Sequence, residues 1–435
     1  MKNKKENRKT VNKKKVLMVL GIILAVICSF LLINMIVNLV VNSKTTEYAA
    51  SFAKVQKEDV IVPEKDENGN WTFTTDRELK VMQLTDIHIG GGWLSLKQDK
   101  MALNAVASMI TAEKPDLVII TGDLVYPVPY ESLSVNNLAP AKILTTLMES
   151  LGVYWIPTFG NHDTEFYSTH TREDIAEFYS SEDLKYCLFQ TGDENIDGYG
   201  NSVINVKNTQ GIITQSIFTL DSHAYTGKGL ISIIKMDYDH IKQNQVDWYK
   251  TTLENNCKYN VDLINSLDVE NKSELLDKYS NINSLLFFHI PLQEYADAWF
   301  EYVDNGYQDT EDVKLLYGTA GEEDDVVFCG VEPDNLFETM LELGGKKAIF
   351  CGHDHVNNFS INYKGILLNY GLSIDYIAYK DIDKMGSQRG CTIITIKPDG
   401  DFDIARENYY QDKYPSLGDF QKESVEMQEL NPDHK

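Results

Sequence analysis

The sequence predicts an α/β domain that follows a single membrane-spanning helix. Three observations support this prediction. Apolar runs of strand length alternate with amphipathic helical segments after Arg77, polar side chains collect where those strands end, and a long uncharged apolar run precedes the domain. With 435 residues and 43% hydrophobic content, the chain can bury a sizeable core.

The N-terminal region has the pattern of a signal anchor. Residues 1–15 are basic, with a net charge of +7, and residues 16–41 contain no charged side chain. At ~1.5 Å per residue the apolar run is about 39 Å long, enough to cross a ~30 Å hydrocarbon core with tilt. It is too long for a cleaved signal peptide and lacks a small-residue cleavage site. The basic segment predicts a single-pass protein of the cell membrane, with a cytoplasmic N-terminus and the body outside.

Two asparagines interrupt this apolar run. Asn34 and Asn38 lie four residues apart, so they share one face of the predicted helix. We interpret them as polar side chains tolerated near the outer interface, and hydrogen bonding to a partner helix is the alternative.

Composition excludes several classes of protein. The whole chain has a formal net charge of −25, so the part after the basic segment carries −32. A body this acidic repels phosphate backbones, and we expect no nucleic-acid partner. The cysteines beyond the apolar run are odd in number and show no C-x-x-C spacing. This usage argues against a disulfide scaffold and against a thiolate zinc site.

A polar stalk is predicted between the anchor and the body. Residues 42–76 include KEDVIVPEKDENGN, whose turn residues and charges suit a tether. The body is predicted over residues 77–407. The polar and acidic segment 408–435 is predicted to be a solvated tail.

The body begins with strands and helices in alternation. ELKVMQLTD and DLVIITGD are predicted strands, and VYWIPTFGNHD is a third strand and its loop. DKMALNAVASMITAEKP and PAKILTTLMESLG are the helices between them. This order implies right-handed crossovers and a mainly parallel sheet. SLLFFHIP and KAIFCGHDH are two further strands along the chain.

Polar groups that suit metal ions follow each of these five strands. The carboxyl ends of the strands in an open α/β sheet face a common crevice, so we expect the groups to converge. Burying so many ionisable side chains would be costly without compensating cations. Carboxylate and imidazole donors without thiolate favour Mn, Fe or Zn, and the number of donors suits two ions. The groups are Asp86 and His88, Gly122 and Asp123, residues 160–163, His289, and His353 with His355.

In their order along the chain, these groups resemble the signatures of calcineurin-like metallophosphoesterases. The matching segments are LTDIHIG, TGDLV, GNHDTE, FFHIP and GHDH, and the resemblance runs from residue 81 to about residue 396. Finer detail, such as AIFCGHDHVNNF running on into NYG, is similar to the short purple-acid-phosphatase-like subgroup. The resemblance implies a central β-sandwich flanked by helices.

The resemblance also implies a dinuclear metal centre and its chemistry. The expected reaction is hydrolysis of a phosphate ester by a metal-bound hydroxide. His162 is expected to protonate the leaving oxygen or to stabilise the transition state, and Asp163 to orient its imidazole or to cap a helix. The implied ligands are Asp86, His88, Asp123 and His355 for one ion, and Asp123, Asn161, His289 and His353 for the other, with Asp123 bridging.

Two further residues are candidates for contact with the substrate. Tyr126 lies three residues past Asp123, where purple acid phosphatases place an iron-binding tyrosinate. Because His88 already supplies an imidazole at that site, we interpret Tyr126 as a pocket wall, with coordination as the alternative. Arg172 is a candidate for gripping the substrate phosphate through two hydrogen bonds, and an exposed arginine at a helix start is the alternative.

Two classes of function fit the sequence. The first is a membrane-anchored hydrolase of small phosphate esters, either monoesters or diesters. The second is a metal-holding domain that binds or senses a ligand without turnover. Every expected ligand and His162 are present, which favours the hydrolase.

Overall fold

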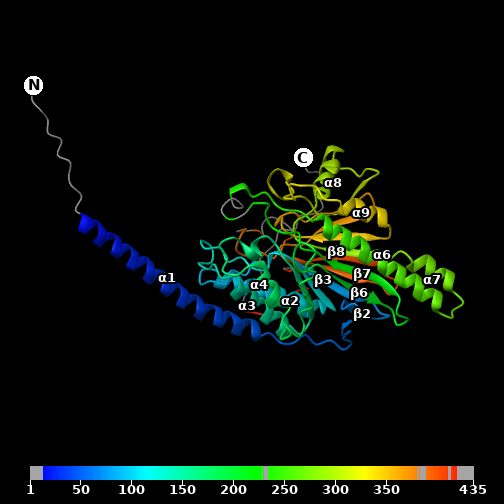
Figure 1. Ribbon diagram of the computed structural model, residues 1–435, viewed down its shortest axis with the longest axis horizontal. Helices are drawn as coiled ribbons and strands as arrows, with labels where there is room; N and C mark the ends of the chain where they lie inside the picture. The colour runs from blue at the N-terminus through cyan, green and yellow to red at the C-terminus, as the bar shows by residue number, and fades with distance from the viewer. Residues whose placement is uncertain are drawn as a thin grey trace, which may run out of the picture.

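Two β-sheets packed face to face form the centre of the body, and helices cover both outer faces (Figure 1). The computed structural model describes residues 13–227, 229, 234–379, 382, 388–409 and 413–418. The expected α/β fold, a β-sandwich flanked by helices behind one long apolar helix, is confirmed.

The first sheet contains the strands that open the body. Among the described residues it has five strands in the order β14-β13-β3-β4-β5. The three strands β3, β4 and β5 run parallel, as predicted, and β13 and β14 add an antiparallel edge. Their bounds are β3 (Leu79–Leu84), β4 (Leu117–Thr121), β5 (Tyr154–Thr158), β13 (Gly390–Ile396) and β14 (Phe402–Asn408).

The second sheet has nine strands within the described ranges, in the order β1-β2-β6-β7-β8-β10-β12-β11-β9. Its centre from β7 to β12 is parallel, and its margin at β11 and β9 is antiparallel. The bounds are β1 (Glu64–Lys65), β2 (Trp71–Thr74), β6 (Ser202–Lys207), β7 (Ile213–Thr219), β8 (Asn283–Phe287), β9 (Val313–Tyr317), β10 (Lys347–Cys351), β11 (Ser360–Tyr363) and β12 (Ile366–Tyr370).

The strands read as continuous apolar runs because both of their faces are buried. In β3, Val81 points into the core between the sheets, whereas Met82 points to the helices outside. Phe287 of β8 and Phe350 of β10 enter the same core from the nine-stranded sheet, and their rings stack with centroids 4.7 Å apart. Alternation along a strand therefore fills two apolar layers at once.

Helices complete these outer layers. Three helices pack on the five-stranded sheet, namely α2 (Leu96–Glu113), α3 (Leu138–Leu151) and α4 (Arg172–Tyr179). The nine-stranded sheet is covered by α6 (Gln243–Ser266), α8 (Gln293–Asp304) and α9 (Leu336–Leu343), with α7 (Lys272–Tyr279) against α6. As predicted, α2 stops before Pro115, with Lys114 in the left-handed conformation.

A single long helix, α1 (Lys13–Ala50), carries the apolar run. Its length and composition are sufficient to cross a membrane. The first part of α1 projects away from the body, and the last part lies on α2 and α3 (Figure 1). Thr45 and Ala49 are buried at that contact.

The segment predicted as a stalk, 42–76, belongs to the body instead. Residues 42–50 continue α1, and β2 pairs in parallel with β6. Phe73 of β2 is fully buried between the sheets. The turn residues that suggested a tether form the tight connection between β1 and β2. Partners far along the chain hold this segment, and local composition does not reveal them.

Part of the predicted tail, 408–435, also packs on the body. Tyr409 and Tyr414 are buried. The Tyr414 hydroxyl donates to Glu113 over 2.7 Å, and the Asn104 amide donates to the Tyr409 hydroxyl over 2.6 Å. The remainder of the tail beyond residue 418, and most of the basic segment 1–15, lie outside the described residues.

Candidate metal centre

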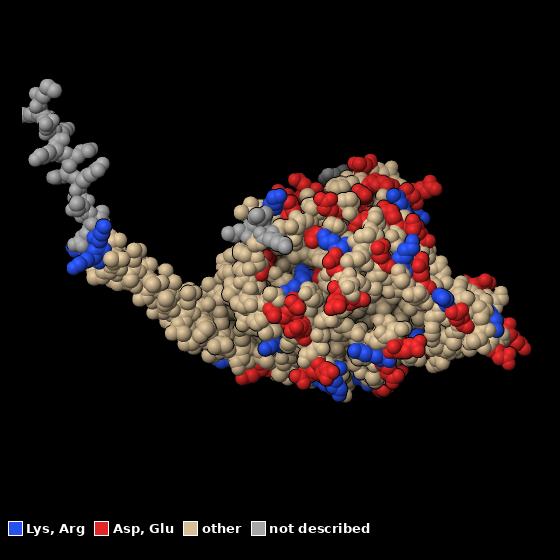
Figure 2. Space-filling model, viewed as in Figure 1, with Lys and Arg blue, Asp and Glu red and all other residues tan. Residues whose placement is uncertain are grey.

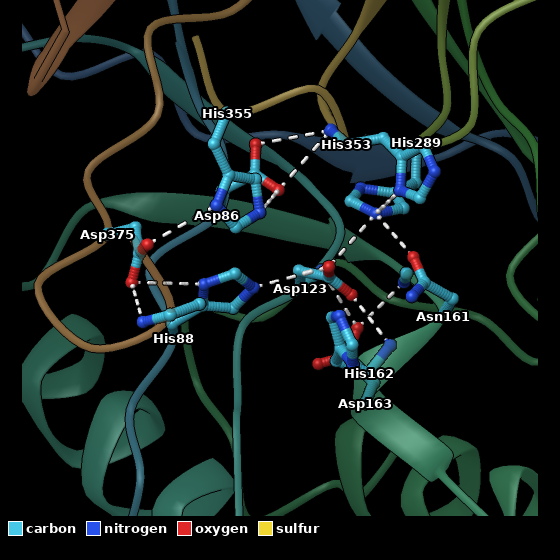
Figure 3. A network of polar contacts seen from close by, with 12 residues as sticks. Asp86, His88, Asp123, Asn161, His162, Asp163, His289, His353, His355 and Asp375 are labelled. Carbon is cyan, nitrogen blue, oxygen red and sulfur yellow. Dashed lines mark hydrogen bonds and ion pairs between the residues drawn. The ribbon is translucent and has the colours of Figure 1, made fainter. Parts of the chain in front are cut away.

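The polar groups predicted at the strand ends come from both sheets, not from one open sheet. Three groups follow β3, β4 and β5 of the five-stranded sheet, and two follow β8 and β10 of the nine-stranded sheet. The ends of these strands meet at one edge of the sandwich, where the side chains converge (Figure 3). The predicted convergence therefore arises by the pairing of two sheets.

The first nest of side chains joins two carboxylates and two imidazoles. The donor atoms of Asp86, His88, Asp123 and His355 all lie within 4.8 Å of one another. His88 Nε2 is 3.3 Å from Asp123 Oδ2, and His355 Nε2 is 3.6 Å from Asp86 Oδ1. All four side chains are buried.

The second nest shares Asp123 with the first. His289 Nε2 lies 3.1 Å from Asp123 Oδ2 and 3.3 Å from His353 Nδ1. The Oδ1 atom of Asn161 is also 3.1 Å from His289 Nε2. The structure thus brings together all seven side chains that the sequence predicted as ligands.

The backbone is shaped to project these side chains. Asp86, His88, Asp123 and His353 have φ angles of 50°, 54°, 49° and 79°, in the left-handed region that non-glycine residues seldom adopt. Such strain persists only where the surroundings fix it, and it is typical of functional sites. Gly122 must be glycine, because a Cβ there would lie 2.5 Å from the His289 ring.

The donor set fits cations. His289 Nδ1 lies 2.8 Å from the carbonyl oxygen of Thr121, so it carries a hydrogen, and the lone pair of Nε2 can bind either a proton or a cation. That lone pair faces oxygens of Asp123 and Asn161, all of them acceptors. A cation between them satisfies every atom. Nitrogen and oxygen donors without thiolate suit divalent metal ions.

Asp375 is a residue that sequence reasoning missed. Its carboxylate lies 3.3 Å from Nδ1 of His88 and 3.3 Å from Nδ1 of His355 (Figure 3). Backbone N–H groups of Ile377 and Tyr379 donate to the same carboxylate over 2.7 and 2.6 Å. Asp375 therefore fixes two rings so that both Nε2 atoms face the first nest, the usual arrangement behind metal-binding histidines.

The side chains of the two nests shift one another's pKa values. Burial opposes the charged form of His88, but Asp375 and Asp123 raise its pKa to about 10. Despite burial, Asp123 likewise raises the pKa of His289 to about 9. Burial and the neighbouring His289 lower the pKa of His353 well below its ordinary value. Protons and cations therefore compete for the same nitrogens.

His162 stands beside the nests and is oriented by Glu165. Its Nδ1 atom lies 2.8 Å from Glu165 Oε1, and its backbone N–H donates to Asp123 Oδ1 over 2.8 Å. Its side chain is 24% exposed, whereas the predicted ligands are buried. Glu165 was also missed by sequence reasoning, although it lies three residues after His162 in GNHDTE.

Asp163 does not contact the His162 ring in the way that was expected. Its carboxylate accepts backbone N–H groups of Asp123, Val125 and Gly160 over 3.1, 3.0 and 2.7 Å. Burial and the nearby Asp123 charge raise the pKa of Asp163 to about 6. Asp163 therefore ties the loop after β4 to the loop after β5.

Tyr126 forms one wall of the site. Its ring centroid lies 4.8 Å from that of His88 and 4.8 Å from that of His162. Burial raises its pKa above the ordinary value. This position agrees with its interpretation as a pocket wall.

Arg172 lies at the start of α4 with its donors already engaged. Nη1 donates to Asp221 Oδ1 over 2.6 Å, and Nη2 donates to the carbonyl oxygen of Gly160 over 2.9 Å. The guanidinium also lies over the ring of Phe159. These contacts favour a role in supporting the loop before Asn161, and they give no support to a grip on phosphate.

Comparisons with known proteins agree with this site. A family model for calcineurin-like phosphoesterase matches residues 79–357. The chain is 27% identical over 330 residues to "Probable inactive purple acid phosphatase 28" of Arabidopsis thaliana, covering 71% of this chain and 73% of that protein. It is 28% identical over 345 residues to "Probable inactive purple acid phosphatase 14" of the same plant, covering 71% and 74%. It is also 25% identical over 304 residues to "Phosphatase DCR2" of Saccharomyces cerevisiae, covering 66% and 46%.

Proposed function

The chain belongs to the calcineurin-like phosphoesterase family, and on that premise we propose that it is a membrane-anchored, metal-dependent hydrolase of phosphate esters. The observation that carries the proposal is the pair of buried donor nests that share Asp123. Such nests suit two ions, which agrees with the centre that the sequence suggested. Similarity to a yeast protein named as a phosphatase supports the reaction class.

The residues of the two nests would hold the ions. Cations there would supply positive charge, which would neutralise phosphate oxygens and lower the pKa of the attacking water. The chain contributes fixed geometry, because close contacts with the Asp375 carboxylate and a hydrogen bond to the Thr121 carbonyl oxygen hold the imidazoles. The proposed ligands are Asp86, His88, Asp123 and His355 in one nest, and Asp123, Asn161, His289 and His353 in the other.

His162 is the proposed proton donor. The contact between its Nδ1 and Glu165 leaves Nε2 to deliver a proton to the leaving oxygen. Its partial exposure gives it access to an entering ester. Asp163 acts through the backbone, since it holds the loops of Asp123 and Gly160 together.

A metal-holding domain without turnover is the second candidate. The words "probable inactive" in the names of the Arabidopsis relatives favour it. The complete donor set and the presence of His162 favour the hydrolase, and the name of the yeast relative includes the word phosphatase.

An activity assay separates the two candidates. Full-length chain in detergent would be supplied with Mn, Fe or Zn and assayed on p-nitrophenyl phosphate and bis(p-nitrophenyl) phosphate. We expect metal-dependent turnover that falls at least about 100-fold in His162→Ala while bound metal is unchanged. His170→Ala, a histidine outside the nests, is the matched control. Stoichiometric metal without turnover of any phosphate ester by the intact chain would favour the binding domain.

The location in the cell is also a proposal. We infer that residues 16–41 lie in or against the cell membrane, with residues 1–15 in the cytoplasm and the body outside. The length and apolar composition of α1, together with the basic residues before it, support this inference. Protease added to intact cells should digest the body, and protection of the body until the cells are lysed would reverse the orientation.

A further inference from the structure

Two loops that begin at the metal centre clamp α1 to the body. Asn34 and Asn38 both donate from Nδ2 to the carbonyl oxygen of Leu133, over 2.9 and 2.8 Å. In return, Trp93 donates from Nε1 to Asn34 Oδ1 and from its backbone N–H to Asn38 Oδ1, over 2.9 and 3.0 Å. The two asparagines therefore bond to the body of the same chain. The sequence alone did not indicate these contacts with Leu133 and Trp93.

The clamp would set the height of the body above a membrane that α1 crosses. Residues 16–33, before the clamp, span about 27 Å as a helix, which matches a hydrocarbon core of ~30 Å. Asn34, Asn38, Thr45 and Ala49 follow one another at helical spacing along the face that meets the body. A bilayer crossed by residues 16–33 would therefore place Asn34 near the boundary of its hydrocarbon core and the two clamped loops at its interface.

The clamped loops expose apolar and aromatic side chains near the expected membrane interface. Trp93 and Leu94 are each 41% exposed, Val135 is 38% exposed and Tyr130 is 74% exposed. Tryptophan and tyrosine are the side chains that membrane interfaces favour. On the face shown in Figure 2, the uncharged surface of α1 continues onto the neighbouring part of the body, where charged side chains are sparse.

An apolar groove of about 490 Å³ lies between α1 and the loop of residues 129–136. Phe30, Leu31, Met35 and Leu39 line it from α1, and Pro129 and Val135 line it from the loop. One wall of the groove is thus the same apolar helix that is long enough to cross a bilayer. In a membrane, lipid acyl chains would surround that helix. They would therefore also be the apolar groups next to the groove.

The metal centre is close to this groove along the chain. Trp93 is five positions after His88, so their Cα atoms are at most about 18 Å apart. The other clamped loop starts at Tyr126, whose ring contacts His88 and His162, and reaches the clamp at Leu133. Both loops link the nests directly to the level of the interface.

We propose that the groove and the loops 92–94 and 129–135 form a lipid-contact surface, that a bilayer acyl chain occupies the groove, and that the substrate is a phosphate ester carried by a membrane lipid. The substrate half of this inference rests on the proposed phosphoesterase function, whereas the lipid contact does not. A water-soluble phosphate ester is the competing substrate.

Fluorescence quenching tests the lipid contact. The full-length chain would be reconstituted into phosphatidylcholine vesicles whose acyl chains carry bromine near the glycerol, since bromine quenches tryptophan on contact. We expect quenching that falls by at least half in Trp93→Phe, because the other tryptophans are less exposed than Trp93. Equal quenching of the two proteins would overturn the lipid contact, whatever the activity.

Turnover tests the substrate. In the same vesicles, phosphatidic acid supplies a monoester and phosphatidylglycerol a diester, with p-nitrophenyl phosphate as the soluble ester. Leu94→Glu with Val135→Glu should lower turnover of one of the lipid esters at least tenfold and change turnover of the soluble ester less than twofold. Leu341→Glu, at a 40% exposed leucine of α9, is the matched control.

The outcomes separate the two proposals. Turnover of the soluble ester without either lipid ester would overturn the lipid substrate and leave the phosphoesterase function standing. Absence of turnover of every ester with metal bound would end both, and quenching would still decide the lipid contact.

Discussion

Glu165 Oε1 lies 2.8 Å from His162 Nδ1, so the side chain that orients the proposed proton donor is three residues away and not adjacent. The Tyr225 hydroxyl donates to the same Glu165 oxygen over 3.1 Å and accepts from Asn161 Nδ2 over 3.0 Å. This chain of contacts couples the proton donor to a proposed metal ligand. A change at Glu165 should therefore affect chemistry more than folding.

Removal of Glu165 should impair turnover without loss of metal. In Glu165→Ala the imidazole loses the acceptor at Nδ1, and we expect kcat to fall about 10–100-fold. Glu165→Gln keeps an acceptor oxygen and should lose less. The measurement is kcat for p-nitrophenyl phosphate together with metal content. Unchanged kcat in Glu165→Ala would show that this contact does not orient His162.

Asp163→Asn should have a different effect, because the carboxylate accepts three backbone N–H groups. An amide retains only one acceptor oxygen, so at least one N–H loses its partner. We expect a lower unfolding temperature and weaker metal retention. A variant with normal stability and normal metal content, but low kcat, would restore the original view of Asp163 as the orienting residue.

Asp375 should control the affinity of one nest. Asp375→Asn weakens the hold on His88 and His355, and we expect metal affinity to fall about 10–100-fold at that nest only. Metal titration followed by calorimetry should then show one weakened and one retained site. Asp312→Asn, at an exposed aspartate before β9, should leave both sites intact. Two unchanged sites in Asp375→Asn would contradict its proposed role.

The strand ends of the centre were predictable, and its supporting residues were not. Asp86, Asp123 and His289 each follow an apolar run whose period and length identify a strand, so local sequence indicated where they meet. Asp375 lies in a loop after β12 without such a pattern. Its role depends on contact with rings that are encoded far from it, and only the folded chain reveals that contact.

The same limit explains the error at the N-terminus. Asn34 and Asn38 looked like isolated polar residues, because their partners Trp93 and Leu133 lie far along the chain. The residues of β2 looked like a tether for the same reason, since their strand partner is β6. Contacts with residues far along the chain, which local composition does not encode, determine the structure of both segments.

Lys347 should be a site where stability can be gained. Its side chain is buried at the start of β10, and its ammonium has no hydrogen-bond partner among the described residues. Burial lowers the pKa of Lys347 from 10.5 to about 8, so the charged form costs stability near neutral pH, and this cost fades as the pH rises above 8.

Lys347→Met should therefore stabilise the fold by up to about 3 kcal/mol at pH 7. This is the free energy that corresponds to the decrease in the pKa of Lys347 from 10.5 to about 8. Thermal unfolding in detergent is the measurement. Lys346→Met removes an exposed contact with Asp401 and should change stability by less than about 1 kcal/mol. A lower unfolding temperature for Lys347→Met would show that this lysine has a stabilising role.

Asp116 should account for part of the loss of folding stability at acid pH. Its burial opposes charge, but hydrogen bonds from Arg77 and Lys57 outweigh burial and lower the pKa of Asp116. A lowered pKa in the folded state gives stability that is present above about pH 4 and is lost as the pH falls through that lowered pKa. Acid therefore removes this contribution.

Asp116→Asn should lower stability at pH 7 by roughly 3 kcal/mol, because Arg77 and Lys57 lose a buried partner. It should also flatten the decline of stability below pH 4, measured by denaturant unfolding at several pH values. Asp59→Asn removes a 76% exposed partner of Arg77 and should have little effect. If stability falls as steeply below pH 4 in Asp116→Asn as in the unmodified chain, groups other than Asp116 cause the loss of stability in acid.

Two cations are proposed to share Asp123, and elemental analysis of the purified full-length chain tests this proposal. We expect about two transition-metal ions per chain after dialysis, and loss of both in Asp123→Ala, because that carboxylate belongs to both nests. A chain that retains no transition metal, or an Asp123→Ala variant that keeps both ions, would contradict it.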